Sequence, residues 1–248
     1  MIVTDINVLN NFLFEGVNDK GVLKAVFMAG GPGSGKSFAA DKIFGVDTIM
    51  SGTSTLGLKV INSDIQFERL LKKVHIDPTK LGQMTDKLFQ YYTTRPESPR
   101  IKAKETVTKL KKIYELGRLG MVLDGTGKDY NKIANEQSRL ESIGYDTAMV
   151  FVNTDLKTAL QRNRQRERVI KDDLVAAYWK KTQANIGKFQ TLFGKYMYIV
   201  DNTEIGDFNK IHKRKISLTT KFVNKPIDNN IGRQWIENEL KLKSLNIK

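Results

Sequence analysis

A glycine-rich loop that directly follows a short apolar run most constrains what this chain can fold into. The run covers 24–29, and the next eight residues read Gly30-Gly-Pro-Gly-Ser-Gly-Lys36-Ser37, which fits the pattern G-x-x-x-x-G-K-[ST]. Glycines let backbone N–H groups converge on phosphate oxygens, and a helix that begins at the loop adds its partial positive charge. The pattern predicts a strand, a loop that binds the phosphates of a nucleoside triphosphate, and a helix over 36–43.

The same pattern assigns roles to individual side chains. Lys36 is expected to reach the β- and γ-phosphates, and the hydroxyl of Ser37 is expected to bind Mg²⁺, which makes Mg²⁺ an expected cofactor. An accidental glycine-rich turn is the alternative, and the position between a strand and a helix disfavours it. The residues predicted to bind the nucleotide are Gly30, Gly31, Pro32, Gly33, Ser34, Gly35, Lys36, Ser37 and Phe38.

Two aspartates follow other apolar runs, at the ends where ligands of open α/β sheets bind. Asp124 ends such a run in the manner of a Walker-B acid, so it is a candidate to hold Mg²⁺ directly or through water. Asp64 is a candidate to accept a proton from an incoming hydroxyl group. A helix-capping or loop role is the alternative for both, and Ser63 with Asp64 has the composition of an N-cap.

Four arginines alternate over 162–168, namely Arg162, Arg164, Arg166 and Arg168. An arginine at a phosphoryl-transfer site stabilises the charge that develops on the transferred group. We therefore predict that these four side chains are catalytic, on a lid over 162–171. The alternative is a solvated basic helix end, where arginines complement the helix dipole.

The rest of the sequence alternates apolar runs with segments of helical period, which is typical of a βαβ architecture with a parallel sheet. Further strands are predicted over 58–61, 121–124, 147–152 and 196–200. Helices are predicted from an N-cap at Ser98 to Gly117, from an N-cap at Asp129 to Gly144, after an N-cap at Thr154, and over 172–188 and 231–242.

The formal net charge of +14 is concentrated in two segments. Segment 69–118 has 13 Lys and Arg against five Asp and Glu, segment 205–248 has ten against four, and the rest is neutral. Clustered positive charge attracts phosphate-rich ligands, so we expect an anionic partner, with solvated helix faces as the alternative. In this segment Arg95 and Arg100 are candidates to contact a phosphate backbone, and the neighbouring Tyr91 and Tyr92 are candidates to stack on bases.

Composition excludes several kinds of site. The chain has no cysteine, which rules out disulfides, thiolate metal sites and cysteine nucleophiles, and its two histidines, His75 and His212, rule out a histidine-rich metal site. The first 20 residues lack the features of a signal peptide, and no run of 18 apolar residues occurs. We expect a cytoplasmic protein with no membrane association, located in the host cytoplasm if a phage encodes it.

Several of these stretches form a recognisable set: 30–37, Asn62-Ser-Asp64, Leu123-Asp-Gly-Thr126, 162–168 and Val200-Asp-Asn-Thr203. Over roughly residues 22–204 the set resembles the P-loop kinases of the zeta-toxin and polynucleotide-kinase type, including versions found in phage genomes. The resemblance implies ATP as the donor and Asp64 as the base that activates the acceptor hydroxyl. The position three residues after Asp64, where polynucleotide kinases of this type usually carry an arginine, is Phe67 here.

The resemblance also implies a fold and a division of the chain. The implied fold is an α/β P-loop NTPase: a three-layer αβα arrangement around a five-stranded parallel sheet with the strand order 2-3-1-4-5. The kinase domain would cover 1–204, with a substrate-side helical insert over 69–118, and a basic C-terminal extension would cover 205–248. By the same resemblance Asp124 and Thr126 lie on the acceptor side, and Asp201 and Asn202 lie where such kinases approach the adenine.

The leading hypothesis is therefore a kinase that moves the γ-phosphoryl group of ATP to a hydroxyl of a nucleotide, a nucleic acid or a related phosphorylated small molecule. The sugar-nucleotide substrate of the zeta toxins is one alternative. An ATP-binding or ATP-hydrolysing protein that acts through association with nucleic acid or a larger assembly is the other. Salt-dependent nucleic-acid binding that needs neither ATP nor Asp64 would favour the latter.

Overall fold

A five-stranded parallel sheet forms the centre of the computed structural model, which describes residues 16–45, 52–166, 169–204 and 206–245. The strands are β1 (Lys24–Ala29), β2 (Lys59–Ile61), β3 (Met121–Asp124), β4 (Asp146–Asn153) and β5 (Met197–Asp201). Their order is β2-β3-β1-β4-β5, and every neighbouring pair is parallel. The predicted fold class and strand order are confirmed.

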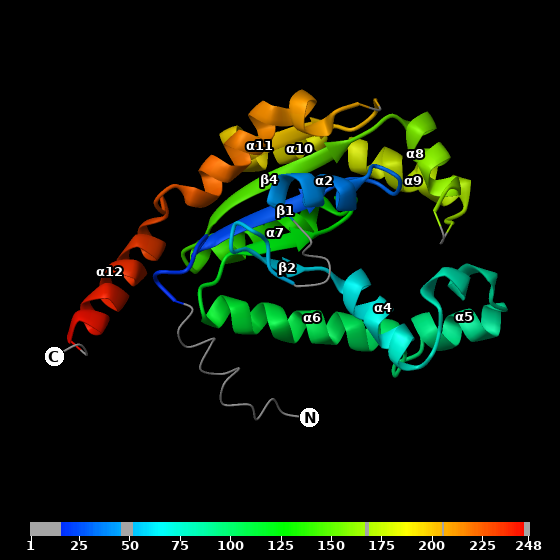
Figure 1. Cartoon of the computed structure of the whole chain (residues 1–248), viewed down its shortest axis with the longest axis horizontal. Coiled ribbons are helices and arrows are strands. Elements are labelled where there is room, and N and C mark those ends of the chain that lie inside the picture. The colour runs from blue at the N-terminus through cyan, green and yellow to red at the C-terminus, as the bar shows by residue number, and fades with distance from the viewer. Residues whose placement is uncertain (1–15, 46–51, 167–168, 205, 246–248) are drawn as a thin grey trace.

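Helices follow the strands along the chain (Figure 1). They are α2 (Lys36–Phe44), α4 (Ser63–Lys73), α5 (Asp86–Thr93), α6 (Pro99–Leu116), α7 (Tyr130–Ser142), α8 (Leu156–Arg164), α9 (Asp172–Gln183), α10 (Ile186–Phe193), α11 (Phe208–Asn224) and α12 (Asn230–Leu245), with 3-10 turns at Pro78–Gln83 and Gly194–Tyr196. Within the described ranges, no helix combines the length and the apolar character that crossing a membrane requires.

Both faces of the sheet are covered, which explains why its strands are almost continuously apolar. All six residues of β1 are buried, and successive side chains point to opposite faces. Val26 and Met28 pack in a core that includes residues of α2 and α11. Ala25 and Phe27 pack in a second core with residues of α7 and α10. The result is the three-layer αβα arrangement expected from the sequence.

The basic segment 69–118 is helical and lies beside the edge strand β2, where Figure 1 shows α4, α5 and α6 together. A small core formed by Phe67, Leu71, Leu81 and Ala103 joins α4, α6 and the 3-10 turn between α4 and α5, and Tyr92 of α5 packs against it. Helices α4 and α6 pack along each other, and α6 begins at the predicted N-cap, where Ser98 Oγ accepts a hydrogen bond from the Ile101 N–H. This packing brings the start of α6 to the start of α4.

Two local predictions were wrong, and one helix was missed. The predicted helix over 172–188 is two helices, because the side-chain amide of Asn185 donates to Gly127 O (3.0 Å) and the chain turns there. The N-cap of α8 is Asp155, whose carboxylate accepts from the Thr158 N–H (2.8 Å), and not Thr154. Helix α11 was not predicted at all, although its Phe222 is buried in the core.

A buried ion pair joins the start of the sheet to the C-terminal segment. Lys24 Nζ donates to Asp146 Oδ2 at 2.8 Å, and the two side chains are only 1% and 8% exposed. The Asp146 carboxylate also accepts the backbone N–H groups of Asp228 (2.9 Å) and Asn229 (3.0 Å), just before α12. Lys24 Nζ reaches the Pro226 carbonyl as well (3.3 Å). The segment between α11 and α12 is thereby fixed to β1 and β4.

Candidate active site

The loop between β1 and α2 has, at two positions, a left-handed backbone conformation that strongly favours glycine. Gly33 and Gly35 have φ angles of 78° and 81°, in the left-handed region. A Cβ atom at Gly33 would lie 2.2 Å from the Ala159 carbonyl oxygen, and one at Gly35 would lie 2.2 Å from the Asn202 side-chain nitrogen. Because Gly35 caps α2 without a side chain, the first N–H groups of the helix stay available to an anion.

Three neighbouring segments hold this loop in place. Asn202, just after β5, donates its side-chain N–H to the Ser34 carbonyl (2.8 Å), and Arg162 of α8 donates to the Asn202 carbonyl (2.6 Å). The Gly30 N–H donates to the Thr126 carbonyl (3.3 Å). Asn202, which was predicted near the adenine, thus contacts the loop itself. The anion-binding surface is supported from β5, α8 and the β3–α7 connection.

Helix α9 closes one side of the loop. A Cβ at Gly31 would lie 3.6 Å from the Trp179 Cα, so the helix backbone packs closely on the loop. The indole N–H of Trp179 donates to the Thr154 carbonyl at 2.8 Å. Close packing of this kind keeps the loop in one conformation before any ligand binds.

Lys36 and Ser37 begin α2 at the mouth of the loop. Lys36 Nζ folds back to the Gly30 carbonyl at 3.1 Å, which places its ammonium group over the loop where phosphates would bind. Ser37 is exposed, and Phe38 is 48% exposed beside it. The lysine and the hydroxyl are therefore both accessible to a ligand.

Asp124, at the end of β3, has one satisfied and one unsatisfied carboxylate oxygen. Its Oδ2 accepts a hydrogen bond from the side-chain amide of Asn62 (2.7 Å), whereas Oδ1 is buried and has no partner among the described residues. Burial raises the pKa of Asp124, the positive charge of Lys36 opposes this rise, and Asp64 adds to it. The unpartnered oxygen is available to a cation, whose positive charge would offset the effect of burial on this carboxylate.

A cavity of about 30 Å³ lies between Asp124, Lys36, Ser37 and Asn62, with apolar side chains around it. Its volume is about that of one water molecule. A buried carboxylate oxygen without a partner, close to a serine hydroxyl, suits a hard cation such as Mg²⁺, which takes few protein ligands and completes its shell with phosphate and water. No group of three or more acidic or histidine ligands occurs in the described part of the chain, so such a cation would depend on the nucleotide for its remaining ligands.

Asp64 lies in the first turn of α4 and is 55% exposed. The N-cap of α4 is Asn62, whose side-chain oxygen accepts the Asp64 N–H at 2.7 Å, so the capping alternative for Ser63 and Asp64 is wrong. Arg100, at the start of α6, forms an ion pair with Asp64 at 2.5 Å and lies over the ring of Phe67 at 5.2 Å. An arginine that is 36 residues away in sequence, in a helix that packs on α4, therefore reaches the Asp64 carboxylate while it stacks on Phe67.

Asn62 is the residue that sequence reasoning missed. Its amide oxygen holds the start of α4 through the Asp64 N–H, and its amide N–H holds the Asp124 carboxylate. One side chain thus fixes the positions of two acids that are 60 residues apart in sequence. The signal was present, because an asparagine between a strand and a helix is a preferred N-cap.

The predicted lid arginines lie in different surroundings. Arg162 contacts the loop through Asn202, whereas Arg164 is 65% exposed and pairs with Asp172 of α9 at 2.5 Å. Arg166 is exposed, and Arg168 lies outside the described residues. Of the arginines that the structure describes in this stretch, Arg162 is the one that the fold brings to the loop.

The other predicted site residues have structural contacts of their own. The Thr126 carbonyl accepts both the Gly30 N–H (3.3 Å) and the Thr182 hydroxyl (3.2 Å). The Asp201 carboxylate accepts the Thr203 N–H at 3.0 Å. Arg95 lies over the ring of Tyr91 at 5.3 Å, between α5 and α6.

A second cavity, of about 280 Å³, opens beside the loop and has an aromatic wall. Phe38 meets Phe208 edge to face at 5.3 Å between ring centroids, and Phe208 contacts His212 at 4.6 Å. Gly35, Arg162 and Asn202 line the same cavity. Its position next to the phosphate loop and its flat apolar side chains suit a nucleobase. Phe208 and His212 were not predicted, because they belong to the helix that the sequence did not reveal.

Fold and loop together define a P-loop NTPase. The sequence profile of the AAA domain family (AAA_33) matches residues 26–188, so the chain belongs to that family. A search of curated proteins found no match.

Several solved structures are similar to this chain at low sequence identity. The AvrRxo1-ORF1:AvrRxo1-ORF2 complex with sulphate ions is 11% identical with a TM-score of 0.55, over 82% of this chain and 63% of that one. A structure from the PezAT toxin–antitoxin system of Streptococcus pneumoniae is 14% identical with a TM-score of 0.48, over 97% and 94%. A gluconokinase from Sinorhizobium meliloti 1021 is 12% identical with a TM-score of 0.46, over 82% and 94%. At 11% identity, the likeness to the first of these structures shows the fold alone.

Proposed function

We propose that this chain is a P-loop kinase that transfers the γ-phosphoryl group of ATP to a hydroxyl of a nucleotide, a nucleic acid or a related phosphorylated small molecule. The observation that carries the proposal is the pair of hydrogen bonds made by Asn62. They hold the backbone N–H of Asp64, whose carboxylate is accessible, and one carboxylate oxygen of Asp124, on the side of the sheet where the phosphate loop lies. Hydrolysis alone needs no second, exposed acid fixed in this way.

Each residue of the site has a role in this reaction. Lys36 and the N–H groups of the loop bind the β- and γ-phosphates, and Arg162 adds positive charge beside the loop. Ser37 and Asp124 would hold Mg²⁺, which when bound neutralises phosphate charge. Asp64 accepts the proton of the acceptor hydroxyl, because its carboxylate is exposed and a substrate can reach it.

Arg100 marks the side from which the acceptor approaches. Its guanidinium already contacts a carboxylate, and the stacking on Phe67 keeps it in place while it exchanges partners. An acceptor that carries a phosphate or carboxylate would compete with Asp64 for this guanidinium, and would free the carboxylate to bind the hydroxyl. The basic helices α4 and α6 favour such an anionic acceptor.

A transfer assay with γ-labelled ATP tests the proposal. The acceptor panel contains DNA and RNA ends, nucleosides, nucleotides and UDP-sugars, and the variant is Asp64→Asn. Asp173→Asn is the matched control, since Asp173 is also an exposed aspartate in the first turn of a helix. We expect label on one acceptor class, lost at least 100-fold in Asp64→Asn and retained in the control. Release of free phosphate with no labelled acceptor would contradict the kinase function and indicate an ATPase.

A further inference from the structure

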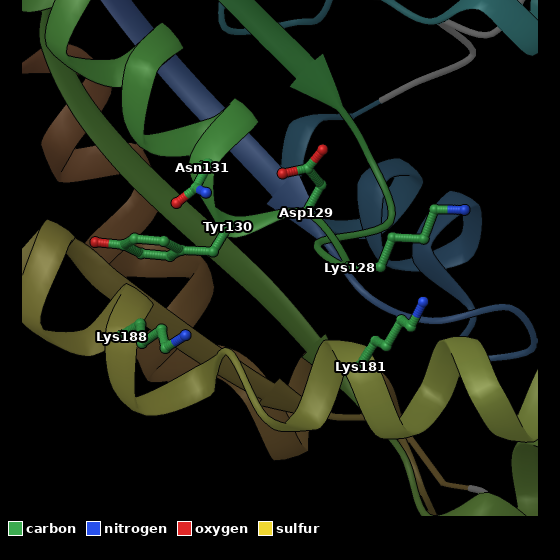
Figure 2. A pocket seen from close by; sticks show the side chains of 6 residues that line it. All are labelled: Lys128, Asp129, Tyr130, Asn131, Lys181 and Lys188. Carbon is green, nitrogen blue, oxygen red and sulfur yellow. The ribbon is translucent and has the colours of Figure 1, made fainter.

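A cavity of about 430 Å³ at the start of α7 has no part in the site described above (Figure 2). It is lined by Lys128, Asp129, Tyr130, Asn131, Lys181 and Lys188. Figure 2 shows Lys181 and Lys188 on the α9 and α10 side of the cavity, with Lys128 and Tyr130 on the opposite side. Three separate elements thus contribute lysines to one opening.

The charge of the cavity is positive and is not neutralised. None of the three lysines forms an ion pair with any acid in the described part of the chain. The carboxylate of Asp129 also lines the cavity, but its Oδ1 accepts the Lys132 N–H (3.1 Å) as the cap of α7. Three lysines against one carboxylate leave the cavity with a net positive charge, which attracts an anion.

Aromatic rings position two of the ammonium groups without cancelling their charge. Lys128 Nζ lies 3.8 Å from the centre of the Tyr178 ring, and Lys188 Nζ lies 5.5 Å from that of Tyr130. A cation over an aromatic face keeps its charge and its N–H donors. Both lysines can therefore contact an aromatic ring and still donate to an anion.

The wall that carries Lys128 is rigid and continues into the active site. The Thr182 hydroxyl donates to the Thr126 carbonyl, and the buried Asn185 amide donates to the Gly127 carbonyl. The same connection begins at Asp124, and its Thr126 carbonyl also accepts the Gly30 N–H of the phosphate loop. The cavity and the candidate catalytic acids thus lie at two ends of one fixed segment.

We propose that this lysine pocket, formed by Lys128, Lys181 and Lys188, binds a phosphate group that the acceptor already carries. The inference rests on the proposed kinase function. Lysine ammonium groups are compact phosphate donors, and the cavity has room for a sugar attached to the phosphate. A phosphate anchored here would orient the acceptor relative to Asp64 and Asp124.

Direct binding tests the pocket apart from catalysis. With the ATP site saturated by a non-hydrolysable ATP analogue and Mg²⁺, calorimetry follows the binding of ribose 5-phosphate and of a dinucleotide. The test variant is Lys181→Gln/Lys188→Gln, and the control is Lys180→Gln/Lys195→Gln, which removes the same charge from exposed lysines outside the pocket. We expect saturable binding that weakens about tenfold in the test variant and less than twofold in the control.

Each outcome decides between stated possibilities. Binding of ribose 5-phosphate supports a small phosphorylated acceptor, and binding of the dinucleotide alone supports a nucleic acid. Equal weakening in both variants would show a general effect of surface charge, and the absence of saturable binding for both probes would also overturn the proposal.

The transfer assay separates the two proposals. If the pocket binds phosphate specifically but no acceptor is labelled, the kinase function fails and the binding site stands. If transfer occurs and the test variant leaves the KM of the acceptor unchanged, the kinase stands and the role of the pocket is wrong. A KM that rises about tenfold while kcat changes little supports both.

Discussion

Replacing Asp146 by asparagine should destabilise the chain far more than its position, remote from the active site, suggests. The substitution removes the negative charge beside Lys24. Because Asp228 and Asn229 donate to different oxygens of the carboxylate and asparagine has a single acceptor oxygen, it also leaves one of these two N–H groups without its acceptor. Lys24 is 1% exposed and cannot reach water without opening the start of the sheet. The variant therefore combines an uncompensated buried charge with the loss of one backbone hydrogen bond.

The magnitude follows from the burial of the pair. Removing one partner of a buried ion pair costs about 3–5 kcal/mol. For a chain of this size each kcal/mol lowers the melting temperature by about 2–4 °C, so we expect a decrease of about 6–20 °C at pH 7. The assay is thermal unfolding followed by circular dichroism, with urea unfolding to give the free energy.

Raising the pH should reduce the loss of unfolding free energy caused by Asp146→Asn. Burial lowers the pKa of Lys24 below the ordinary value of 10.5, and the attraction of Asp146 opposes that change. Without Asp146 the folded-state pKa falls further. Between this lowered pKa and 10.5 the unfolded chain binds more protons than the folded one, so the stability of the variant rises with pH.

Asp228→Asn is the matched control, because Asp228 belongs to the same network but is 62% exposed. We expect it to change the free energy of unfolding by less than about 1 kcal/mol. Equal losses in the two variants, or a deficit for Asp146→Asn that grows with pH, would refute the reasoning.

Three further predictions concern the active site. Gly33→Ala should weaken ATP-analogue binding at least tenfold, because its Cβ would lie 2.2 Å from the Ala159 carbonyl; unchanged affinity in calorimetry would contradict this. Asp124→Asn should raise the free energy of unfolding by about 1 kcal/mol, since burial raises the pKa of this acid, and should abolish phosphoryl transfer. Thermal unfolding and the transfer assay, run on the same variant, check both effects, and a lower free energy of unfolding would contradict the prediction. Arg100→Gln should raise the KM of an anionic acceptor about tenfold in steady-state kinetics, with the KM of ATP unchanged; the opposite split would place Arg100 on the donor side.

Much of the fold could be predicted because buried parallel strands are continuous apolar runs. The predicted strand over 147–152 differs from β4 (Asp146–Asn153) by one residue at each end. Helix α11 was missed because it has no continuous apolar run. Its buried residues, such as Phe222, are spread among lysines, and they are buried because the helix packs on α2 and β5. The break at Asn185 depends on a hydrogen bond to Gly127, which is 58 residues away.

The candidate site was predictable only where a local pattern determines it. The phosphate loop and the two acids stand next to strands in sequence, so their place at one edge of the sheet follows from the parallel arrangement. The contact between Arg100 and Asp64 spans 36 residues and exists because α4 and α6 pack together. No periodicity within either helix could reveal it.

The close packing of α9 on the phosphate loop has a practical consequence. The chain contains two tryptophans, and one of them, Trp179, packs on Gly31 while its indole bonds to Thr154. The other, Trp235, lies in α12. Replacing Trp235 by phenylalanine would leave Trp179, beside the phosphate loop, as the single tryptophan, so that the tryptophan emission of the unlabelled protein would report in real time when the loop fills and empties.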